Sequence, residues 1–352
     1  MRKFLGVVAF LVSVGLPASA NAALQTLSSL FVFGDSLSDG GNSGLVSQAA
    51  TNGAYTYPPS PYYNGQYSNG PVAVEYLWRS YNGNAPFIPS LAGGTNYAIG
   101  GATTGVDNFN AISSTTGALG PAYVQLGNNW QLNTFGAQLA GGRTFDPVSS
   151  LFVIWTFPND VFNWVENGGF TSGTIGGAAG VGPVGVDALI GNGINNIVQT
   201  VLALASTGAQ HFLIPNMPDL GEVPEFKGTA FEPGMKAVSQ GFNFYLAQAL
   251  TALDAQLASA EIVQFDLFET LNRAAANPGA YGFMNTTEKC IDHILDGRCD
   301  PSNNTWLFWD GVHPTTYAHS IIGAEFRAAV PEPETILLLA FGLLGILATR
   351  RR

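Results

Sequence analysis

The stretch Leu30–Gly44 reads LFVFGDSLSDGGNSG, in which four apolar residues run into Gly34-Asp35-Ser36 and a polar, glycine-rich segment. A continuous apolar run of this length, without strict alternation, is typical of a parallel β-strand that is buried on both faces. Ser36 follows that strand directly. Its hydroxyl has two possible roles, as the cap of the next helix or as a nucleophile. Residues elsewhere in the chain must decide between them.

Three further apolar runs resemble the first, and stretches with helical spacing of apolar residues separate the later ones. This alternation predicts an α/β fold with a doubly wound, mostly parallel sheet between helical layers. The expected strands are Leu30–Phe33, Leu151–Trp155, Phe212–Pro215 and Ile262–Phe265, and the expected helices cover 186–205, 234–258 and 315 or 316 to 329.

Functional side chains are expected where the strands end, because ligands bind at the carboxyl edge of such sheets. Ser36, Asn159 and Asn216 fall at these positions. Residues 40–130 and 164–184 are rich in Gly, Asn, Tyr and Ser and have weak periodicity. They are expected to form long ordered loops over this edge.

The two ends of the chain are expected to lie outside the folded domain, which is assigned to residues 23–330. Residues 1–22 combine basic residues, an apolar run and small residues at Ala20 and Ala22, the order of a secretory signal peptide. Residues 331–352 begin Pro-Glu-Pro and continue with a short apolar run and three terminal arginines. They resemble a PEP-CTERM sorting tail.

That resemblance implies export to the surface or extracellular matrix of a Gram-negative bacterium. It also implies transient anchoring in the inner membrane, followed by removal of the tail by a dedicated processing enzyme. A permanent single-helix anchor is the alternative.

The predicted domain is strongly acidic. The two ends hold five of the 13 basic and two of the 24 acidic residues, which leaves a net charge near −14 between them. Nucleic acids and anionic membrane surfaces are therefore unsuitable partners.

Cys290 and Cys299 are the only cysteines, and in an oxidising compartment they are expected to form a local disulfide. A metal site with His293 is the alternative, but it lacks a clear fourth ligand. No metal is expected.

A nucleophilic serine requires a base, an acid that orients the base, and donors for an oxyanion. Among the four histidines, His313 is distinctive because Asp310 precedes it by three residues in LFWDGVHP. A tight turn there can bring the carboxylate to Nδ1 and leave the other nitrogen for Ser36. Taken without Ser36, the pair is more typical of a capped turn with a surface histidine. The remaining histidines, at 211, 293 and 319, are expected to be structural.

Two segments can supply oxyanion donors. TNYAIGGAT, over 95–103, ends in Gly100 and Gly101, where backbone N–H groups can approach a ligand closely. LFVIWTFPND, over 151–160, ends a strand by presenting the Asn159 amide. Each segment also has a purely structural interpretation as a turn.

The motifs FGDSLSD, NYAIGGAT, Asn-Asp after a strand and D-x-x-H occur in this order, and together they resemble those of the GDSL/SGNH hydrolase family. The resemblance implies a flavodoxin-like α/β/α fold and lipolytic esterase activity without a cofactor. By position it implies Ser36 as nucleophile, His313 as base and Asp310 as orienting acid. The backbone N–H groups of Ser36 and Gly101 and the Asn159 amide form the implied oxyanion hole.

One position departs from the family pattern. Phe157 stands where the family has glycine, two residues before Asn159. Its ring is expected to tilt this strand end or to narrow the acyl site. Asp35 and Asp39 are expected to hydrogen-bond within the turn and at the start of the next helix, without acting as second acids.

The sequence therefore predicts an exported serine esterase or lipase that cleaves a small-molecule, lipid or acetylated-glycan ester. Two alternatives remain open at this level. One is an acyltransferase that uses the same triad, and the other is a non-catalytic protein of the cell surface or matrix.

Overall fold

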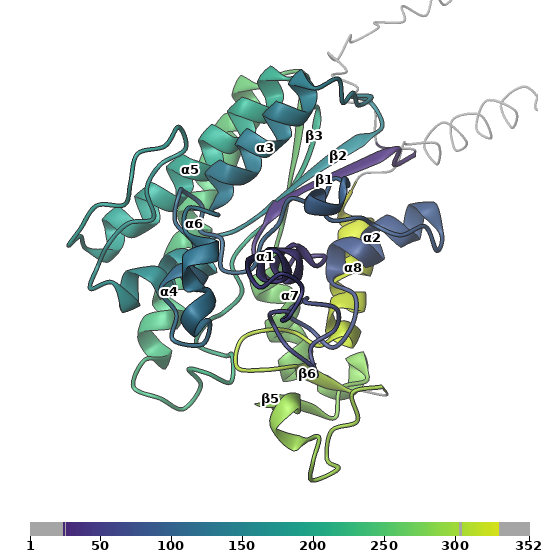
Figure 1. Cartoon of the computed structure of the whole chain (residues 1–352), viewed down its shortest axis with the longest axis vertical. Coiled ribbons are helices and arrows are strands. Elements are labelled where there is room, and N and C mark those ends of the chain that lie inside the picture. Colours follow the sequence, from purple (N-terminus) through teal and green to yellow (C-terminus); the bar gives the residue numbers. More distant parts are fainter. Residues whose placement is uncertain (1–23, 25, 303–304, 331–352) are drawn as a thin grey trace, which may run out of the picture.

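The computed structural model describes residues 24, 26–302 and 305–330, so the predicted signal peptide and sorting tail lie outside the described residues. Its main sheet has four parallel strands in the order β1-β2-β3-β4 (Figure 1). The predicted strands are confirmed to within one residue at each end. They are β1 (Ser29–Gly34), β2 (Ser150–Trp155), β3 (His211–Pro215) and β4 (Glu261–Phe265).

Residues 95–99 extend this sheet beyond β1. The Val32 N–H donates to Thr95 O at 3.1 Å, and the Tyr97 N–H donates to Val32 O at 2.8 Å. The Ile99 N–H continues the pattern at Gly34 O, and the Val32–Asn96 bridge is parallel. With this segment counted second in chain order, the sheet reads 2-1-3-4-5. This is the flavodoxin-like order, and it confirms the predicted fold class.

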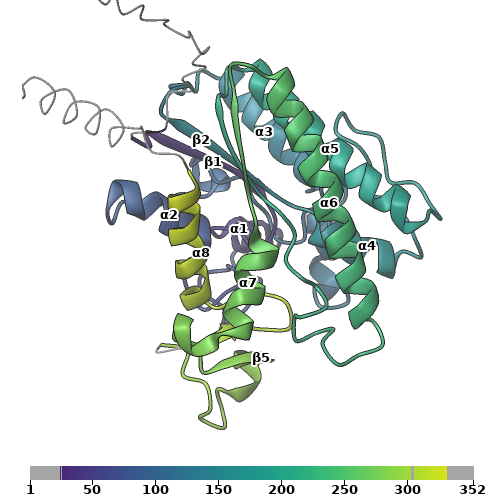
Figure 2. The same ribbon diagram turned by 180° about the vertical axis from the view of Figure 1, so that it is seen from behind.

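Helices cover both faces of the sheet (Figures 1 and 2). On one face lie α2 (Ala73–Asn82), α7 (Leu267–Ala276) and α8 (Thr316–Ala329). On the other lie α3 (Asn128–Ala140), α5 (Val186–Ser206) and α6 (Glu232–Gln256).

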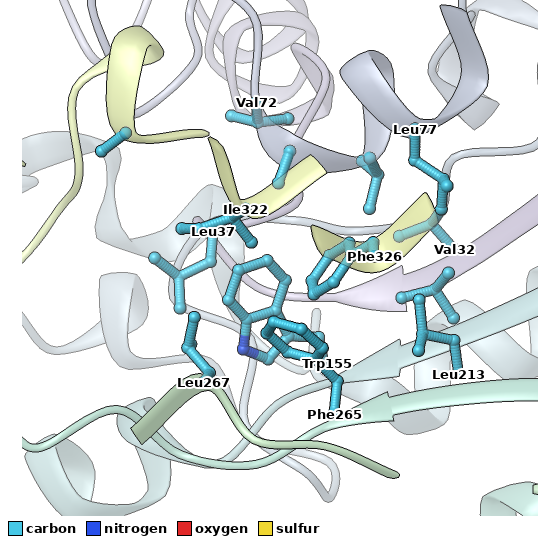
Figure 3. Packing of buried hydrophobic residues seen from close by; sticks show 14 of the residues in the cluster. Val32, Leu37, Val72, Leu77, Trp155, Leu213, Phe265, Leu267, Ile322 and Phe326 are labelled. Atoms are coloured by element: carbon cyan, nitrogen blue, oxygen red, sulfur yellow. The ribbon is translucent and has the colours of Figure 1, made fainter. Parts of the chain in front are cut away.

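Each strand places alternate residues on opposite faces, and both sets are apolar. Val32, Val153 and Leu213 belong to the core beneath α2, α7 and α8. In that core Phe326 of α8 makes edge contacts with Trp155 and Phe265, at centroid distances of 5.4 and 4.8 Å (Figure 3). This packing fixes α8, which follows the loop that carries His313.

The opposite face carries an aromatic core. Phe31 stacks on Phe152 at 4.8 Å and meets Phe135 of α3 edge-on at 5.4 Å. Among the described residues, α5 is the one helix that is long and apolar enough to cross a membrane. Leu189, Val201 and their buried neighbours pack it into this core, so its apolar character suits a core helix.

The expectation of loops over 40–130 was wrong in part. This region contains α1 (Asn42–Ala50) as well as α2, and α3 begins at its end. Glycine and serine in NSGLVSQAA weaken the apolar periodicity of α1, which leaves tertiary contacts to stabilise it. Helix α4 (Pro158–Glu166) and the parallel strand pair β5 (Asn285–Lys289) and β6 (Trp306–Phe308) were likewise not foreseen.

Phe157 has a backbone φ of +119°, which side chains rarely adopt and which suits glycine. Its ring is fully buried and stacks on Phe242 of α6 at a centroid distance of 3.7 Å. Gly193 of α5 leaves room for it, because a Cβ there would lie 2.4 Å from the ring. The expectation of a narrowed acyl site was therefore wrong, since the ring packs into the core between α5 and α6.

We expect Phe157→Gly to lower the free energy of unfolding by about 2–4 kcal/mol. The lost ring packing outweighs the relief of the positive φ. Urea denaturation measures this change. Phe242→Ala is the matched control, because it removes the partner ring without relieving the backbone and should cost more. A Phe157→Gly protein as stable as the wild type would contradict this balance.

Candidate active site

Ser36 lies in a tight turn directly after β1. The Leu37 N–H donates to Asp35 Oδ1 at 3.0 Å, and the Ser38 N–H donates to Asp35 O at 3.1 Å. Asp39 then starts α1 by accepting the N–H groups of Gly41, Asn42 and Ser43 at 2.7–3.0 Å. The two aspartates thus make hydrogen bonds of the kind the sequence predicted, and they hold Ser36 at the sheet edge.

Ser36, His313 and Asp310 form one hydrogen-bonded chain. Ser36 Oγ lies 2.8 Å from His313 Nε2, although the two residues are 277 positions apart. His313 Nδ1 lies 2.7 Å from Asp310 Oδ2 and 2.9 Å from Oδ1. A serine in this arrangement can lose its proton to the imidazole, and the carboxylate can stabilise the charge that develops there.

The loop that carries Asp310 and His313 is closed by its own hydrogen bonds. Asp310 Oδ1 accepts the backbone N–H groups of Val312 and His313 at 2.9 and 2.8 Å. Burial acts to raise the pKa of Asp310, but the adjacent His313 and these hydrogen bonds outweigh burial and lower the pKa below its usual value. Asp310 is thereby kept ionised beside the imidazole.

Sequence reasoning missed Tyr62, which donates its hydroxyl to Asp310 Oδ2 at 2.7 Å. Its ring meets the Trp309 ring edge-on at 5.9 Å and packs beside the buried Cys290–Cys299 disulfide. No spacing pattern links residues 248 positions apart, so no sequence signal could have found this contact.

The backbone N–H groups near Ser36 are candidate donors to an anion. The Gly100 N–H is already used, because it donates to Asp39 Oδ2 and Ser43 Oγ at 2.9 Å. In the described part of the chain, no acceptor pairs with the N–H groups of Ser36 or Gly101. Gly101 has φ +79°, and a Cβ there would lie 2.4 Å from Asn108 Oδ1, so only glycine fits. Because the Gly100 N–H is already paired, Gly101 is the better candidate donor of the two.

Asn159 is the second residue of α4 and is nearly buried. Its Nδ2 donates to Ala102 O at 3.2 Å, which holds the amide next to Gly101. Asn216, by contrast, is not brought to the site. Its Nδ2 donates to Asp266 Oδ1 at 2.9 Å and its Oδ1 accepts the Phe268 N–H, so it fixes the start of α7.

The other histidines and the cysteines have structural partners. His211 Nδ1 lies 3.1 Å from Glu261 Oε2, and His293 contacts Asp296. His319 Nδ1 accepts the Ala73 N–H, and burial lowers its pKa to about 3. Cys290 and Cys299 are bonded to each other, so they are not free to hold a metal. Among the described residues, no cluster of three metal-ligating side chains occurs.

Ser36 and His313 open onto a cavity of about 750 Å³. Gly101, Asn159 and Asp310 also line it, whereas Phe157 does not. The volume lies in the range of small-molecule sites. The cavity therefore has room for a substrate on both sides of a scissile bond.

Two buried acids lie beneath the site. Burial raises the pKa of Asp35 to about 7 and that of Asp160 to about 6. Asp160 accepts hydrogen bonds from the Thr104 N–H at 2.8 Å and the Thr104 hydroxyl at 2.6 Å. Asp35 Oδ2 is buried and meets no partner within the described ranges. Asp35 holds the turn that contains Ser36, and Asp160 connects the start of α4 to Thr104.

Residues 30–326 match the family model described as GDSL-like lipase/acylhydrolase. The chain belongs to this family. Residues 329–352 match the PEP-CTERM protein-sorting motif, which indicates export and membrane-targeted sorting in Gram-negative bacteria.

Relatives of this GDSL-family protein include esterases, lipases and a hemolysin. The chain is 26% identical to the thermolabile hemolysin of Vibrio parahaemolyticus over 87% of its own length and 65% of the hemolysin. It is 26% identical to the GDSL esterase/lipase ENOD8 of Medicago truncatula over 86% of each chain. With Lipase 1 of Photorhabdus luminescens it shares 24% identity over 93% of its length and 54% of the lipase.

The chain thus spans about two thirds or less of the hemolysin and of Lipase 1. A solved acetyl xylan esterase aligns over 86% of this chain and all of its own, with 11% identity and a TM-score of 0.38.

We expect Tyr62→Phe to lower kcat for ester hydrolysis about three- to tenfold, because one donor to the Asp310 carboxylate is lost. Steady-state kinetics on a short-chain nitrophenyl ester measures the change. Tyr63→Phe is the matched control, since the neighbouring side chain is exposed. An unchanged kcat in Tyr62→Phe would show that the Tyr62 hydroxyl does not support Asp310 in the reaction.

Stability is expected to depend on the ionisation of Asp35. The unfolded chain loses this proton near pH 3.8 and the folded protein near pH 7, so the folded state binds more protons between these values. The free energy of unfolding therefore falls as pH rises through this window. Asp35→Asn should reduce the decrease in the free energy of unfolding between pH 4 and pH 8 by a few kcal/mol, as measured by urea denaturation at these two pH values. Parallel pH profiles for the two proteins would refute this assignment.

Proposed function

We propose that this protein is an exported carboxylic-ester hydrolase that works through an acyl-enzyme on Ser36. One observation carries the proposal: the hydrogen-bonded chain Ser36–His313–Asp310 opens onto the cavity beside two unpaired backbone N–H groups. The family match and the esterase and lipase relatives support the same chemistry.

In the first half-reaction, Ser36 Oγ attacks the ester carbonyl carbon while His313 Nε2 accepts its proton. The developing oxyanion receives hydrogen bonds from the N–H groups of Ser36 and Gly101 and from the Asn159 amide. Asp310, held by Tyr62 and two backbone N–H groups, stabilises the protonated imidazole. His313 then protonates the leaving alcohol oxygen, and the C–O bond breaks.

In the second half-reaction, His313 takes a proton from water, which attacks the acyl carbon. The tetrahedral intermediate collapses, Ser36 Oγ recovers the proton from His313, and the carboxylic acid leaves. The two half-reactions together use side chains and backbone N–H groups of this chain and consume one water molecule.

Export of the chain is supported by two independent features. The carboxyl-terminal sorting motif belongs to exported proteins, and the buried disulfide between Cys290 and Cys299 suits an oxidising compartment. The predicted signal peptide over residues 1–22 is consistent with both.

Ser36→Ala and His313→Ala are each expected to lower kcat for a short-chain nitrophenyl ester by about 10³-fold or more. A fluorophosphonate probe should label the Ser36 peptide in the folded wild-type protein. Ser38→Ala, two residues along the same turn, is the control and should retain labelling and turnover. Absence of an adduct on Ser36 in folded protein would overturn the proposed function.

Asn159→Ala is expected to lower kcat about 10²–10³-fold with little change in KM, because its amide stabilises charge that develops in the transition state. Asn216→Ala is the matched control at the end of a neighbouring strand, and its kcat should stay near that of the wild type. Equal kcat values in these two variants would exclude Asn159 from the oxyanion hole.

A further inference from the structure

One wall of the catalytic cavity is built from phenylalanines. Phe162 of α4 contacts Phe109 and Phe226 at ring distances of 5.8 and 6.0 Å. Leu220 and Met235 extend the same apolar surface. We call this set of five residues the phenylalanine wall. Such a surface stabilises a bound apolar group by removing it from water.

The phenylalanine wall begins at the oxyanion donors. The Phe109 N–H donates to Gly101 O at 2.7 Å, and Phe162 lies one turn after Asn159 on α4. An ester carbonyl held by these donors therefore has its acyl carbon next to this wall.

A different wall of the cavity is built from tyrosines and hydroxyl groups. Tyr67 contacts Tyr57 and Tyr62 at ring distances of 6.2 and 6.5 Å. The Tyr57 hydroxyl lies 3.1 Å from Thr115 Oγ1, which in turn lies 2.8 Å from Ser113 Oγ. We call these five residues the tyrosine wall. Flat aromatic faces beside hydroxyl groups suit a ligand that carries both C–H surfaces and hydroxyls.

The tyrosine wall reaches the catalytic base. The Tyr67 ring lies 5.1 Å from the His313 ring, and Tyr62 is bonded to Asp310. Because His313 must protonate the leaving oxygen, the alcohol half of an ester lies on this side of the site.

The charge of the cavity restricts the alcohol further. Asp35, Glu166, Glu225 and Asp310 line it, and among the described lining residues there is no lysine or arginine. The ammonium of Lys289, next to this lining, is paired with Glu225 Oε2 at 2.8 Å. An anionic alcohol, such as a phosphorylated headgroup or coenzyme A, would therefore meet the remaining carboxylates, and it would have to compete with Glu225 for that ammonium.

We propose that the preferred substrate is a neutral ester that joins an apolar acyl chain to a polyhydroxylated alcohol. This inference rests on the proposed function. The acyl chain lies on the phenylalanine wall and the alcohol on the tyrosine wall. Water cleaves the acyl–oxygen bond, giving the carboxylic acid and the free polyol. A glycerol ester and a sugar ester share this chemistry, and the experiment separates them.

The test compares kcat/KM for four octanoyl esters: 1-monooctanoylglycerol, 6-O-octanoylglucose, ethyl octanoate and octanoyl-coenzyme A. We expect at least one of the two polyol esters to exceed ethyl octanoate by about tenfold or more, which corresponds to about 1.4 kcal/mol of transition-state binding. Octanoyl-coenzyme A should be the poorest substrate. The better of the two polyol esters identifies glycerol or sugar as the alcohol.

Two variants separate the walls. Tyr57→Ala should reduce the preference for polyol over ethyl ester to about threefold or less, and Tyr57→Phe should give an intermediate value. Phe162→Ala should leave that preference intact but lower the octanoyl-to-acetyl ratio about fivefold or more for one alcohol.

The inference would be overturned if the wild-type protein cleaved ethyl octanoate or octanoyl-coenzyme A at least as efficiently as it cleaves both polyol esters. A polyol preference that survives Tyr57→Ala in folded protein would also overturn it. If Ser36 is not labelled and nitrophenyl acetate is not hydrolysed, the proposed function itself fails. The two failures are therefore distinguishable.

Discussion

The hydrogen bond between Ser36 and His313 is the constraint on which the site depends, because it joins residues 277 positions apart. Its two atoms must stay near 2.8 Å, so both backbones need independent support. Asp35 and Asp39 hold the turn after β1. On the other side, the Trp309 N–H donates to His313 O at 2.7 Å. The loop is thus closed at its own base before it meets the serine.

Hydrophobic packing carries this support into the body of the protein. The buried α8, which follows the His313 loop, packs through Phe326 against the ends of β2 and β4. Thr315 anchors the start of that helix by donating its hydroxyl to Trp306 O at 2.7 Å. Packing at crystal-like density resists small displacements, so the sheet and α8 behave as one frame for the catalytic loop.

Buried charge and backbone strain gather around the same edge of the sheet. Asp35 and Asp160 are carboxyl groups with raised pKa values, and Phe157 holds an unfavourable φ two residues before Asn159. Such costs are common where a structure positions functional groups. Here the apolar stack of Phe157 on Phe242 offsets the strain and sets where α4 begins.

The sequence alone determined the four main strands, the long helices and the pairing of Asp310 with His313, because these depend on apolar periodicity and on contacts within a single turn. Tertiary structure decided what depends on distant groups. Tyr62 reaches Asp310 across 248 positions, and the Gly100 N–H is unavailable to a ligand because Asp39 and Ser43 occupy it. The direction of the Phe157 ring likewise depended on the space that Gly193 leaves in α5. Local patterns report on neighbours along the chain, whereas these three features are set by residues that meet only after folding.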